Sequence, residues 1–210
     1  MTTQTISKLN GLEMPTLDPP VGLRIAFYGP MASGKSFCAD YLWRQSVWNK
    51  MALADTLKGW AYSIFHVTGK DGVNRQFLQE LGDFLRSWDD EIFIKHLLWK
   101  VHEHDAYNPH NNVVVDDVRY LNEAKYLKRN GFKLVKVDTD TEIRSKRILE
   151  LYPNFDWTRI THRSEQEWEK IRPDYVIQSN TPAEAWYQLE KMLSEYESIK
   201  TRPRRKRAVR

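Results

Sequence analysis

The sequence has almost no cysteine and no long hydrophobic run. Cys38 is the one cysteine among 210 residues, which excludes an intrachain disulfide and a zinc site built from cysteines. No stretch approaches the roughly 18 consecutive apolar residues that a membrane span needs. Residues 1–10 are polar and lack the apolar centre of a secretory signal. These absences favour a cytoplasmic protein without membrane contact, and the length favours a single domain.

Excess charge is also scarce, and it is concentrated in one segment. The formal net charge is +4, yet residues 200–210 carry seven lysines and arginines and no acidic residue. We expect residues 200–210 to form a disordered basic tail, which serves solubility or makes a weak contact with nucleic acid. Residues 1–20 hold Pro15, Pro19 and Pro20 without any periodicity and are expected to form an extended arm. Residues 21–199 are then the folded domain, and its charge is slightly acidic.

Apolar runs alternate with helical patterns along this domain. Strands are predicted at residues 23–28, 47–53, 113–115, 132–137 and 175–177. Helices are predicted at residues 35–44, 55–66, 74–87, 90–104, 120–130, 141–151 and 181–198. This alternation predicts an α/β fold with a parallel sheet of about five strands flanked by helices. The long interval between the second and third strands leaves room for an inserted helical substrate-binding region. The tryptophans, such as Trp43, Trp60, Trp99 and Trp186, are expected in the core.

A glycine-rich segment follows the first strand. Residues 29–36 read Gly-Pro-Met-Ala-Ser-Gly-Lys-Ser, which is Gly, four residues, Gly, Lys, Ser. Glycines allow the backbone to turn its N–H groups toward phosphate oxygens, and the helix that begins near Lys35 directs its positive end at the same anion. Lys35 would neutralise phosphate oxygens, and the Ser36 hydroxyl would bind Mg²⁺. The segment therefore predicts a nucleoside triphosphate site made by Gly29, Ala32, Ser33, Gly34, Lys35 and Ser36.

Two carboxylates end the third strand. Asp116 and Asp117 follow the run Val113–Val115, and Arg119 comes two residues later. In an open parallel sheet, ligands lie outside the carboxyl ends of the strands. A carboxylate there can bind Mg²⁺ through water or accept a proton from an attacking group, so Asp117 is a candidate catalytic and metal-binding residue. The alternative is that Asp117 caps a helix.

Several segments resemble the phage deoxynucleoside monophosphate kinases. Residues 117–124, Asp-Val-Arg-Tyr-Leu-Asn-Glu-Ala, are similar to the family's Asp-Val-Arg-Phe-Pro-Asn-Glu-Ala, with Tyr120 for Phe and Leu121 for Pro. Residues 54–58, 78–86, 162–165 and 174–180 also resemble family segments, and all of them occur in the family order. Asp83 stands where the family usually has Thr.

The resemblance implies a kinase that transfers the γ-phosphate of ATP, with Mg²⁺, to a deoxynucleoside monophosphate in the cytoplasm (that of the host if a phage encodes it). It implies the P-loop nucleotide-kinase fold with a lid, and a homodimer is left open. On the helix 74–87, side chains at positions 75, 79 and 86 share one face with Gly82, so the acceptor candidates there are Arg75, Gln79 and Arg86. Asn180 is implied as a nucleotide contact, and Arg119 as both a catalytic and an acceptor residue.

The remaining candidates stay open between function and structure. Asp55 and Lys58 follow the second strand and either face the acceptor phosphate or are structural. Arg144 and Arg147 open the helix where kinase lids carry phosphate-binding arginines, with surface charge as the alternative. Two other functions also remain: a P-loop kinase of another acceptor such as dephospho-coenzyme A, and a P-loop ATPase that binds nucleic acid. The body of the chain has no basic stripe, which disfavours the last.

Overall fold

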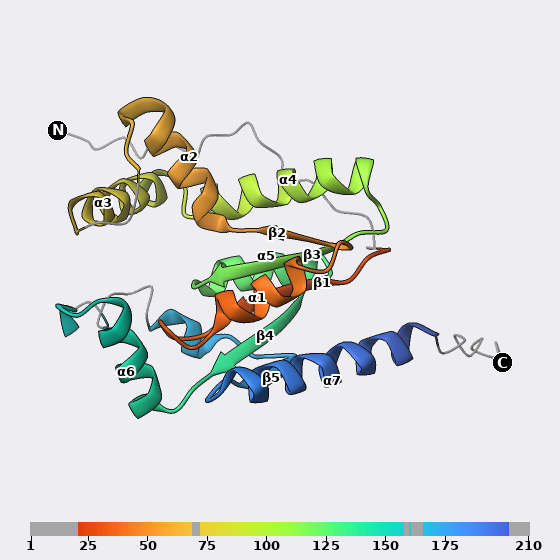
Figure 1. Ribbon diagram of the computed structural model, residues 1–210. Helices are drawn as coiled ribbons and strands as arrows, with labels where there is room; N and C mark the ends of the chain where they lie inside the picture. The colour runs from red at the N-terminus through yellow and green to blue at the C-terminus, as the bar shows by residue number, and fades with distance from the viewer. Residues whose placement is uncertain (1–20, 69–71, 158–159, 161–165, 202–210) are drawn as a thin grey trace.

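The computed structural model describes residues 21–68, 72–157, 160 and 166–201 (Figure 1). The arm expected at residues 1–20, residues 202–210 of the expected tail and the matched segment at 162–165 lie outside the described residues. The last helix runs to Thr201 and so includes the first two residues of the expected tail.

Five parallel strands form the centre of the molecule. They are β1 (Arg24–Tyr28), β2 (Trp48–Met51), β3 (Asn112–Val118), β4 (Lys133–Asp138) and β5 (Tyr175–Gln178). Their order in the sheet is β2-β3-β1-β4-β5, and every neighbouring pair is parallel. The predicted α/β fold with a five-stranded parallel sheet is confirmed. Because the strands are parallel, all of them end on one edge of the sheet, at the left in Figure 1.

Helices fill the intervals between the strands, as predicted. They are α1 (Lys35–Trp43), α2 (Leu53–Phe65), α3 (Gly72–Trp88), α4 (Ile92–Tyr107), α5 (Leu121–Arg129), α6 (Thr141–Leu151) and α7 (Pro182–Thr201), with a short 3-10 helix η3 (Glu167–Lys170). The helical insertion expected between the second and third strands consists of α2, α3 and α4. None of the described helices combines the length and apolarity that crossing a membrane requires.

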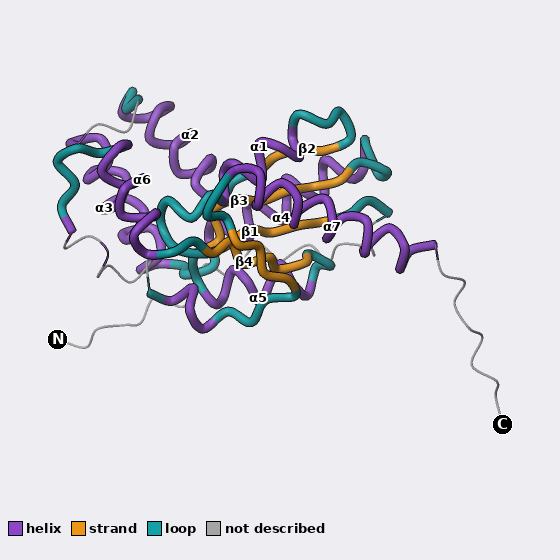
Figure 2. The backbone as a smooth tube through the Cα atoms, turned by 60° about the horizontal axis from the view of Figure 1, so that its bottom comes forward, coloured by secondary structure: helices purple, strands orange, loops and turns teal. Residues whose placement is uncertain are grey.

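The sheet separates two hydrophobic cores. On one face, alternate strand residues pack against α4 and α5, and on the other against α1 and α7. Figure 2 shows the strands between α1 and α5. The central strands β1 and β3 are buried on both faces, which explains the continuous apolar runs at residues 25–28 and 113–115. The expectation of core tryptophans is wrong for Trp43, Trp99 and Trp186, which are 58%, 39% and 50% exposed. The sequence pattern placed these tryptophans on helices, but it did not show that the helix faces carrying them are exposed to solvent.

Strand β3 contains a bulge at its carboxyl end. The pairing of β1 with β3 shifts between Ala26 and Tyr28, so Asp116 and Asp117 together lie opposite Phe27. An extra residue of this kind changes the direction of the side chains beside it. It places Val118 in the same core as Val113 and Val115. Asp116 and Asp117, as neighbours in the strand, point to opposite faces of the sheet.

The loop between β1 and α1 is held close to the ends of β4 and β5. Gly29 has φ +139° and Gly34 has φ +101°, backbone conformations that favour glycine, and Ala32 also has a positive φ of 61°. A Cβ atom on Gly29 would lie 2.3 Å from the carbonyl oxygen of Val137, and one on Gly34 would lie 2.4 Å from Ser179 Oγ. Both glycines are therefore required by geometry as well as by conformation.

This geometry predicts that Gly29→Ala destabilises the protein. The substitution combines an unfavourable φ with a clash against backbone, so we expect a loss of about 1–3 kcal/mol in the free energy of unfolding. Urea unfolding followed by circular dichroism measures it. Gly59→Ala is the matched control, because a Cβ there has no neighbour within 4 Å. The control should be neutral or slightly stabilising within α2. Equal stabilities of Gly29→Ala and wild type would contradict the loop geometry.

Candidate active site

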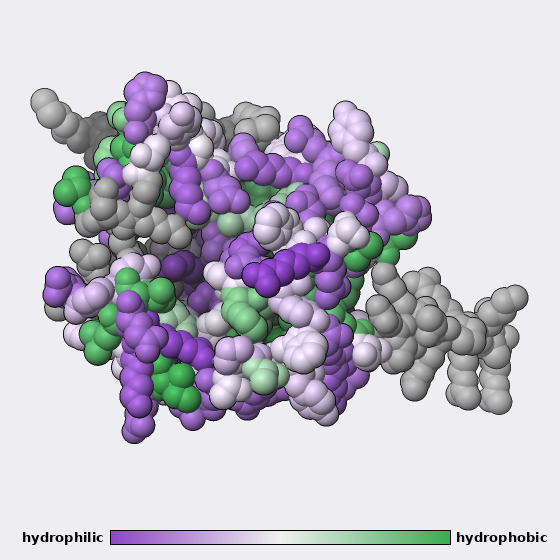
Figure 3. Space-filling view, viewed as in Figure 1, coloured by the Kyte–Doolittle hydropathy of each residue, from purple (hydrophilic) through white to green (hydrophobic). Residues whose placement is uncertain are grey.

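A cleft of about 450 Å³ lies beside the glycine-rich loop. Its walls come from that loop with the start of α1, from the end of α6, and from the segment after β5. The lining residues are Met31, Ala32, Gly34, Lys35, Ser36, Phe37, Arg147, Glu150, Leu151, Tyr152, Ser179 and Pro182. On the same side of the molecule, Figure 3 shows a hollow between the part built by α2 and α3 and the part built by α6. The cleft has the size of a nucleotide site.

The loop has the geometry of a phosphate cradle. Positive φ at Ala32 and Gly34 bends successive N–H groups into a concave surface, and α1 begins directly after it, at Lys35. The Lys35 ammonium donates hydrogen bonds to the carbonyl oxygens of Gly29 (3.0 Å) and Pro30 (2.6 Å). Ser36 is exposed, so its hydroxyl is accessible to a cation. Ser33 Oγ is buried and has no hydrogen-bond partner among the described residues.

Arg147 connects helix α6 to this loop. Its guanidinium donates to the carbonyl oxygens of Ser179 (2.7 Å) and Asn180 (2.9 Å), and lies 3.5 Å from the Ala32 carbonyl oxygen. Arg147 therefore lines the cleft, and its predicted phosphate-binding role stays a prediction. Arg144, one turn earlier, is half-buried and does not line that cleft.

Asn180 and Thr139 join the loops after β4 and β5. The Asn180 side chain accepts the N–H of Asp140 (2.9 Å) and donates to that residue's carboxylate (3.1 Å). The Thr139 hydroxyl lies 2.9 Å from the Ser33 carbonyl oxygen. The side chain of Asn180, expected to contact nucleotide, thus supports the loops behind the cleft, while its carbonyl oxygen holds Arg147.

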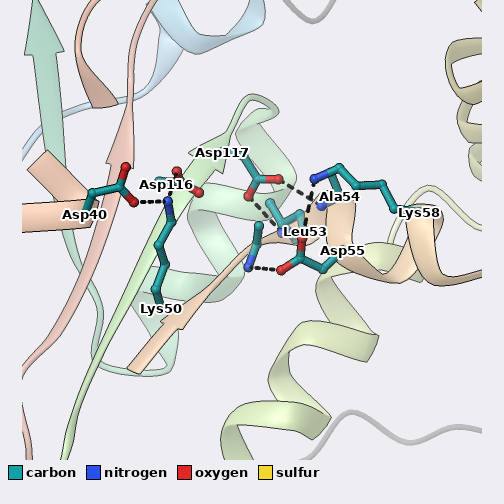
Figure 4. Close-up of polar contacts among 9 residues, drawn as sticks. Asp40, Lys50, Leu53, Ala54, Asp55, Lys58, Asp116 and Asp117 are labelled. Carbon is teal, nitrogen blue, oxygen red and sulfur yellow. Dashed lines mark hydrogen bonds and ion pairs between the residues drawn. The ribbon is translucent and has the colours of Figure 1, made fainter. Parts of the chain in front are cut away.

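Asp116 forms an ion pair beneath α1. Lys50 of β2 places its ammonium 2.9 Å from Asp116 and 2.7 Å from Asp40 of α1 (Figure 4). Burial alone would lower the pKa of Lys50, but its hydrogen bonds to Asp40 and Asp116 raise it above the usual value. Asp40 lies one helical turn after Ser36, so this ion pair ties the phosphate-loop helix to the ends of β2 and β3.

Asp117 points the other way, to the beginning of α2. Its two carboxylate oxygens accept the N–H groups of Leu53 and Ala54, each at 2.8 Å (Figure 4). Burial raises the pKa of Asp117, while these two N–H groups oppose the rise. Asp117 therefore does cap a helix, as the alternative reading proposed. The capped helix is α2, which is far away in sequence, and not the helix that follows Asp117. Its predicted role with a metal or an attacking group stays a prediction.

Asp55 and Lys58 lie in the first turns of α2 and are largely exposed. Asp55 accepts the N–H of Ala52 (3.2 Å), an acidic side chain reaching back to the residue before the helix. Lys58 lies 3.4 Å from Asp55. These contacts give both side chains a structural role at the beginning of α2. Because the side chains are exposed, binding of an acceptor phosphate stays a prediction.

Arg86 of α3 lies at the end of β3. Its guanidinium stacks on two rings, 4.5 Å from the centre of Phe93 and 4.7 Å from that of Tyr120, and lies 3.7 Å from the carboxylate of Glu123. A Cβ on Gly82 would lie 3.3 Å from Arg86 Nη1, so the glycine leaves room for this side chain. Arg86 therefore lies beside the beginning of α5, directly after the Asp117–Arg119 segment, and its predicted acceptor role stays a prediction.

Other acceptor candidates on α3 are less constrained. Gln79 is exposed. Arg75 belongs to the helix, but its side chain lies outside the described part of the chain. Arg119, after β3, is half-buried.

Sequence reasoning missed Asp40, Lys50 and Glu123. Glu123 was noted only as part of a matched segment, yet it is 3% exposed and its Oε2 accepts the N–H groups of Arg119 and Tyr120, both at 3.0 Å. An acidic residue at the third helical position was the available signal for this backbone contact. No local pattern could have revealed the ion pair of Lys50, because its partners come from α1 and β3.

No group of three or more His, Cys, Asp or Glu side chains is arranged to hold a metal ion within the described ranges. A magnesium site on a phosphate loop needs no such group, since it uses one or two protein oxygens together with phosphate oxygens and water. The exposed Ser36 hydroxyl fits that requirement.

The burial of Glu123 predicts a pH dependence of stability. Burial raises the pKa of Glu123 from 4.5 to about 7, although the N–H groups of Arg119 and Tyr120 and the charge of Arg86 oppose the rise. The folded protein then binds the proton more tightly than the unfolded chain does, so Glu123 stabilises most below pH 4.5 and this contribution is lost as the pH rises to about 7. The free energy of unfolding of wild type, measured relative to that of Glu123→Gln in urea, should therefore fall as the pH rises across this window. A difference that is independent of pH would contradict it.

Comparison with known proteins supports a kinase-like fold. No protein-family model matches the chain. A protein of Acanthamoeba polyphaga mimivirus, provisionally named a deoxynucleotide monophosphate kinase, is 27% identical over 190 residues, which cover 78% of this chain and 91% of the viral protein.

Two solved structures share the fold at low identity. The APS kinase CysC of Mycobacterium tuberculosis, in complex with AMPPNP and APS, has a TM-score of 0.51 and 18% identity and covers 85% of this chain and 99% of its own. The protein TT1252 of Thermus thermophilus has a TM-score of 0.57 and 19% identity and covers 88% and 100%. The chain is therefore a distant homologue of the viral protein and has the fold of the P-loop small-molecule kinases.

Proposed function

We propose that this protein transfers the γ-phosphoryl group of ATP to the phosphate of a deoxynucleoside monophosphate, giving a deoxynucleoside diphosphate and ADP. The observation that carries the proposal is the placement of two cationic sites at neighbouring strand ends. Lys35 and Arg147 line the cleft after β1, and Arg86 lies at the end of the adjacent strand β3. The mimivirus relative supports a monophosphate as the acceptor.

On the triphosphate side, the loop's backbone would bind the β- and γ-phosphates. Phosphoryl transfer needs positioning and positive charge more than it needs covalent chemistry. Lys35 and Arg147 would neutralise charge on the transferring group, and Arg144 would join them if α6 moves toward the cleft. When bound, Mg²⁺ would supply further positive charge between the phosphates, with Ser36 as a protein ligand and Asp117 as a ligand through water.

On the acceptor side, arginines suit a monophosphate because a planar guanidinium binds two oxygens at once. Arg86 and Arg119 would bind the acceptor phosphate, and Arg75 and Gln79, earlier on α3, would contact the rest of the nucleotide. Asp55 and Lys58 would extend this surface along α2. Asp117 holds the start of α2 through two N–H groups, and so fixes this helix to the strand end where the two substrates would meet.

The direct test is an assay of the full-length protein with ATP, Mg²⁺ and each of dAMP, dCMP, dGMP and dTMP, with product diphosphates measured by chromatography. We expect one or more of the four to be phosphorylated. Dephospho-coenzyme A belongs in the same panel. Its phosphorylation, without phosphorylation of the monophosphates, would favour the alternative of a P-loop kinase with another acceptor. ATP hydrolysis that needs no acceptor and responds to DNA would favour an ATPase instead.

Lys35→Ala should reduce phosphoryl transfer at least about a hundredfold, since it removes a cation that stabilises charge developing on the transferring group. Circular dichroism should show an intact fold. Lys125→Ala, at an exposed lysine of α5, is the control and should keep wild-type turnover. A folded Lys35→Ala protein with near wild-type rates would show that the loop is not part of the active site.

Arg86→Lys should raise the KM for the monophosphate about tenfold or more and leave the KM for ATP within about twofold. Lysine keeps a positive charge beside Glu123, which protects the fold, but it lacks the fork that binds two phosphate oxygens. Steady-state kinetics with each substrate varied in turn measure both constants. Arg129→Lys on α5 controls for the loss of an exposed guanidinium. Equal increases for both substrates would argue against a separate acceptor site.

A further inference from the structure

Glu123 lies where the two arginine-bearing parts of the proposed acceptor site meet. Its Oε2 accepts the N–H of Arg119 and that of Tyr120, which fixes the backbone between β3 and α5. Its Oε1 faces the Arg86 guanidinium at 3.7 Å, and so reaches α3. One carboxylate thus contacts the backbone of one acceptor arginine and the side chain of the other.

We propose that Glu123 is a positioning residue that holds Arg86 and Arg119 in the arrangement that binds the acceptor phosphate. The inference rests on the proposed function. Glu123 does not itself touch a substrate, because its side chain is 4% exposed. It acts through the two arginines, as an anion that orients one guanidinium and as an acceptor that fixes the chain bearing the other.

The aromatic rings around Arg86 do not fix how its guanidinium is rotated within its own plane. Phe93 and Tyr120 lie near it at 4.5 Å and 4.7 Å, and such stacking tolerates rotation of the guanidinium within its plane. The ion pair with Glu123 selects one orientation. Tyr120 also donates its backbone N–H to Glu123. The same carboxylate therefore holds the residue whose ring stacks on Arg86 and faces the Arg86 guanidinium.

A purely structural role would not require a charge at this position. Burying a carboxylate is costly, so the stability of the fold alone does not explain why a charged side chain stands here. A glutamine could still accept the two N–H bonds through its carbonyl oxygen. The property that glutamine lacks is the negative charge facing Arg86, and this is the property that orienting a guanidinium uses.

The test is the binding of deoxynucleoside monophosphates to Glu123→Gln by calorimetry, at a pH above about 8, where the Glu123 carboxylate of wild type is ionised, and at a temperature where wild type and variant are both folded. We expect the dissociation constant to rise about tenfold, with the dissociation constant for ATP within about twofold. In steady-state assays the KM for the monophosphate should rise in parallel, more than kcat falls. A substitution that only lowered folding stability would leave these dissociation constants and KM values unchanged in the folded protein.

Glu190→Gln is the matched control, because Glu190 of α7 also holds a side chain, the Tyr41 hydroxyl at 2.7 Å, away from the acceptor site. If wild type binds no monophosphate, the proposed function fails and the role of Glu123 falls with it. If wild type binds a monophosphate and Glu123→Gln binds it equally or more tightly, the function stands and the positioning role is overturned. If Glu123→Gln does not fold, Glu123→Asp tests the same role, because it keeps the charge but withdraws it from Arg86 by one methylene group. Its acceptor affinity should then fall while ATP binding is kept, and unchanged acceptor affinity would overturn the positioning role.

Discussion

Near its carboxyl end, strand β3 carries two adjacent carboxylates, Asp116 and Asp117, and the contacts at this edge of the sheet depend on the pair. Neighbouring side chains in a strand point to opposite faces of the sheet, so the two carboxylates reach different partners. Asp116 pairs with Lys50, and Asp117 accepts the first N–H groups of α2. Both partners belong to segments that precede β3 by more than fifty residues, so the end of β3 holds together parts of the chain that are distant in sequence.

The segment from Asp116 to Glu123 consequently connects the helices α1, α2 and α3 around the proposed reaction centre. Asp116 reaches α1 through Lys50 and Asp40, which connects it to the phosphate loop. Asp117 holds α2, and Glu123 reaches α3 through Arg86. A displacement of this segment would therefore move the triphosphate side and the acceptor side together.

The two halves of the site are held by different kinds of interaction. The phosphate loop is shaped by backbone conformation and close backbone approach, as at Gly29, where a side chain has no space. The acceptor half is held by side chains that meet across helices, such as Arg86 with Glu123. Side-chain contacts can be changed one residue at a time without altering the chain's path, so differences in acceptor preference would arise more readily on this half than differences in triphosphate binding.

The sequence alone determined the parallel sheet, its five strands and the phosphate loop, because buried strands, helical periodicity and a Gly-rich turn are local patterns that follow from backbone sterics and burial. It also marked Arg86 and Arg147, through helical spacing and the family resemblance. Only the tertiary structure decided that Lys50 pairs with Asp40 and Asp116, that Asp117 caps α2, and that buried Glu123 faces Arg86. Those contacts join elements far apart along the chain, and a polar side chain's partner is set by which elements pack together rather than by its neighbours in sequence.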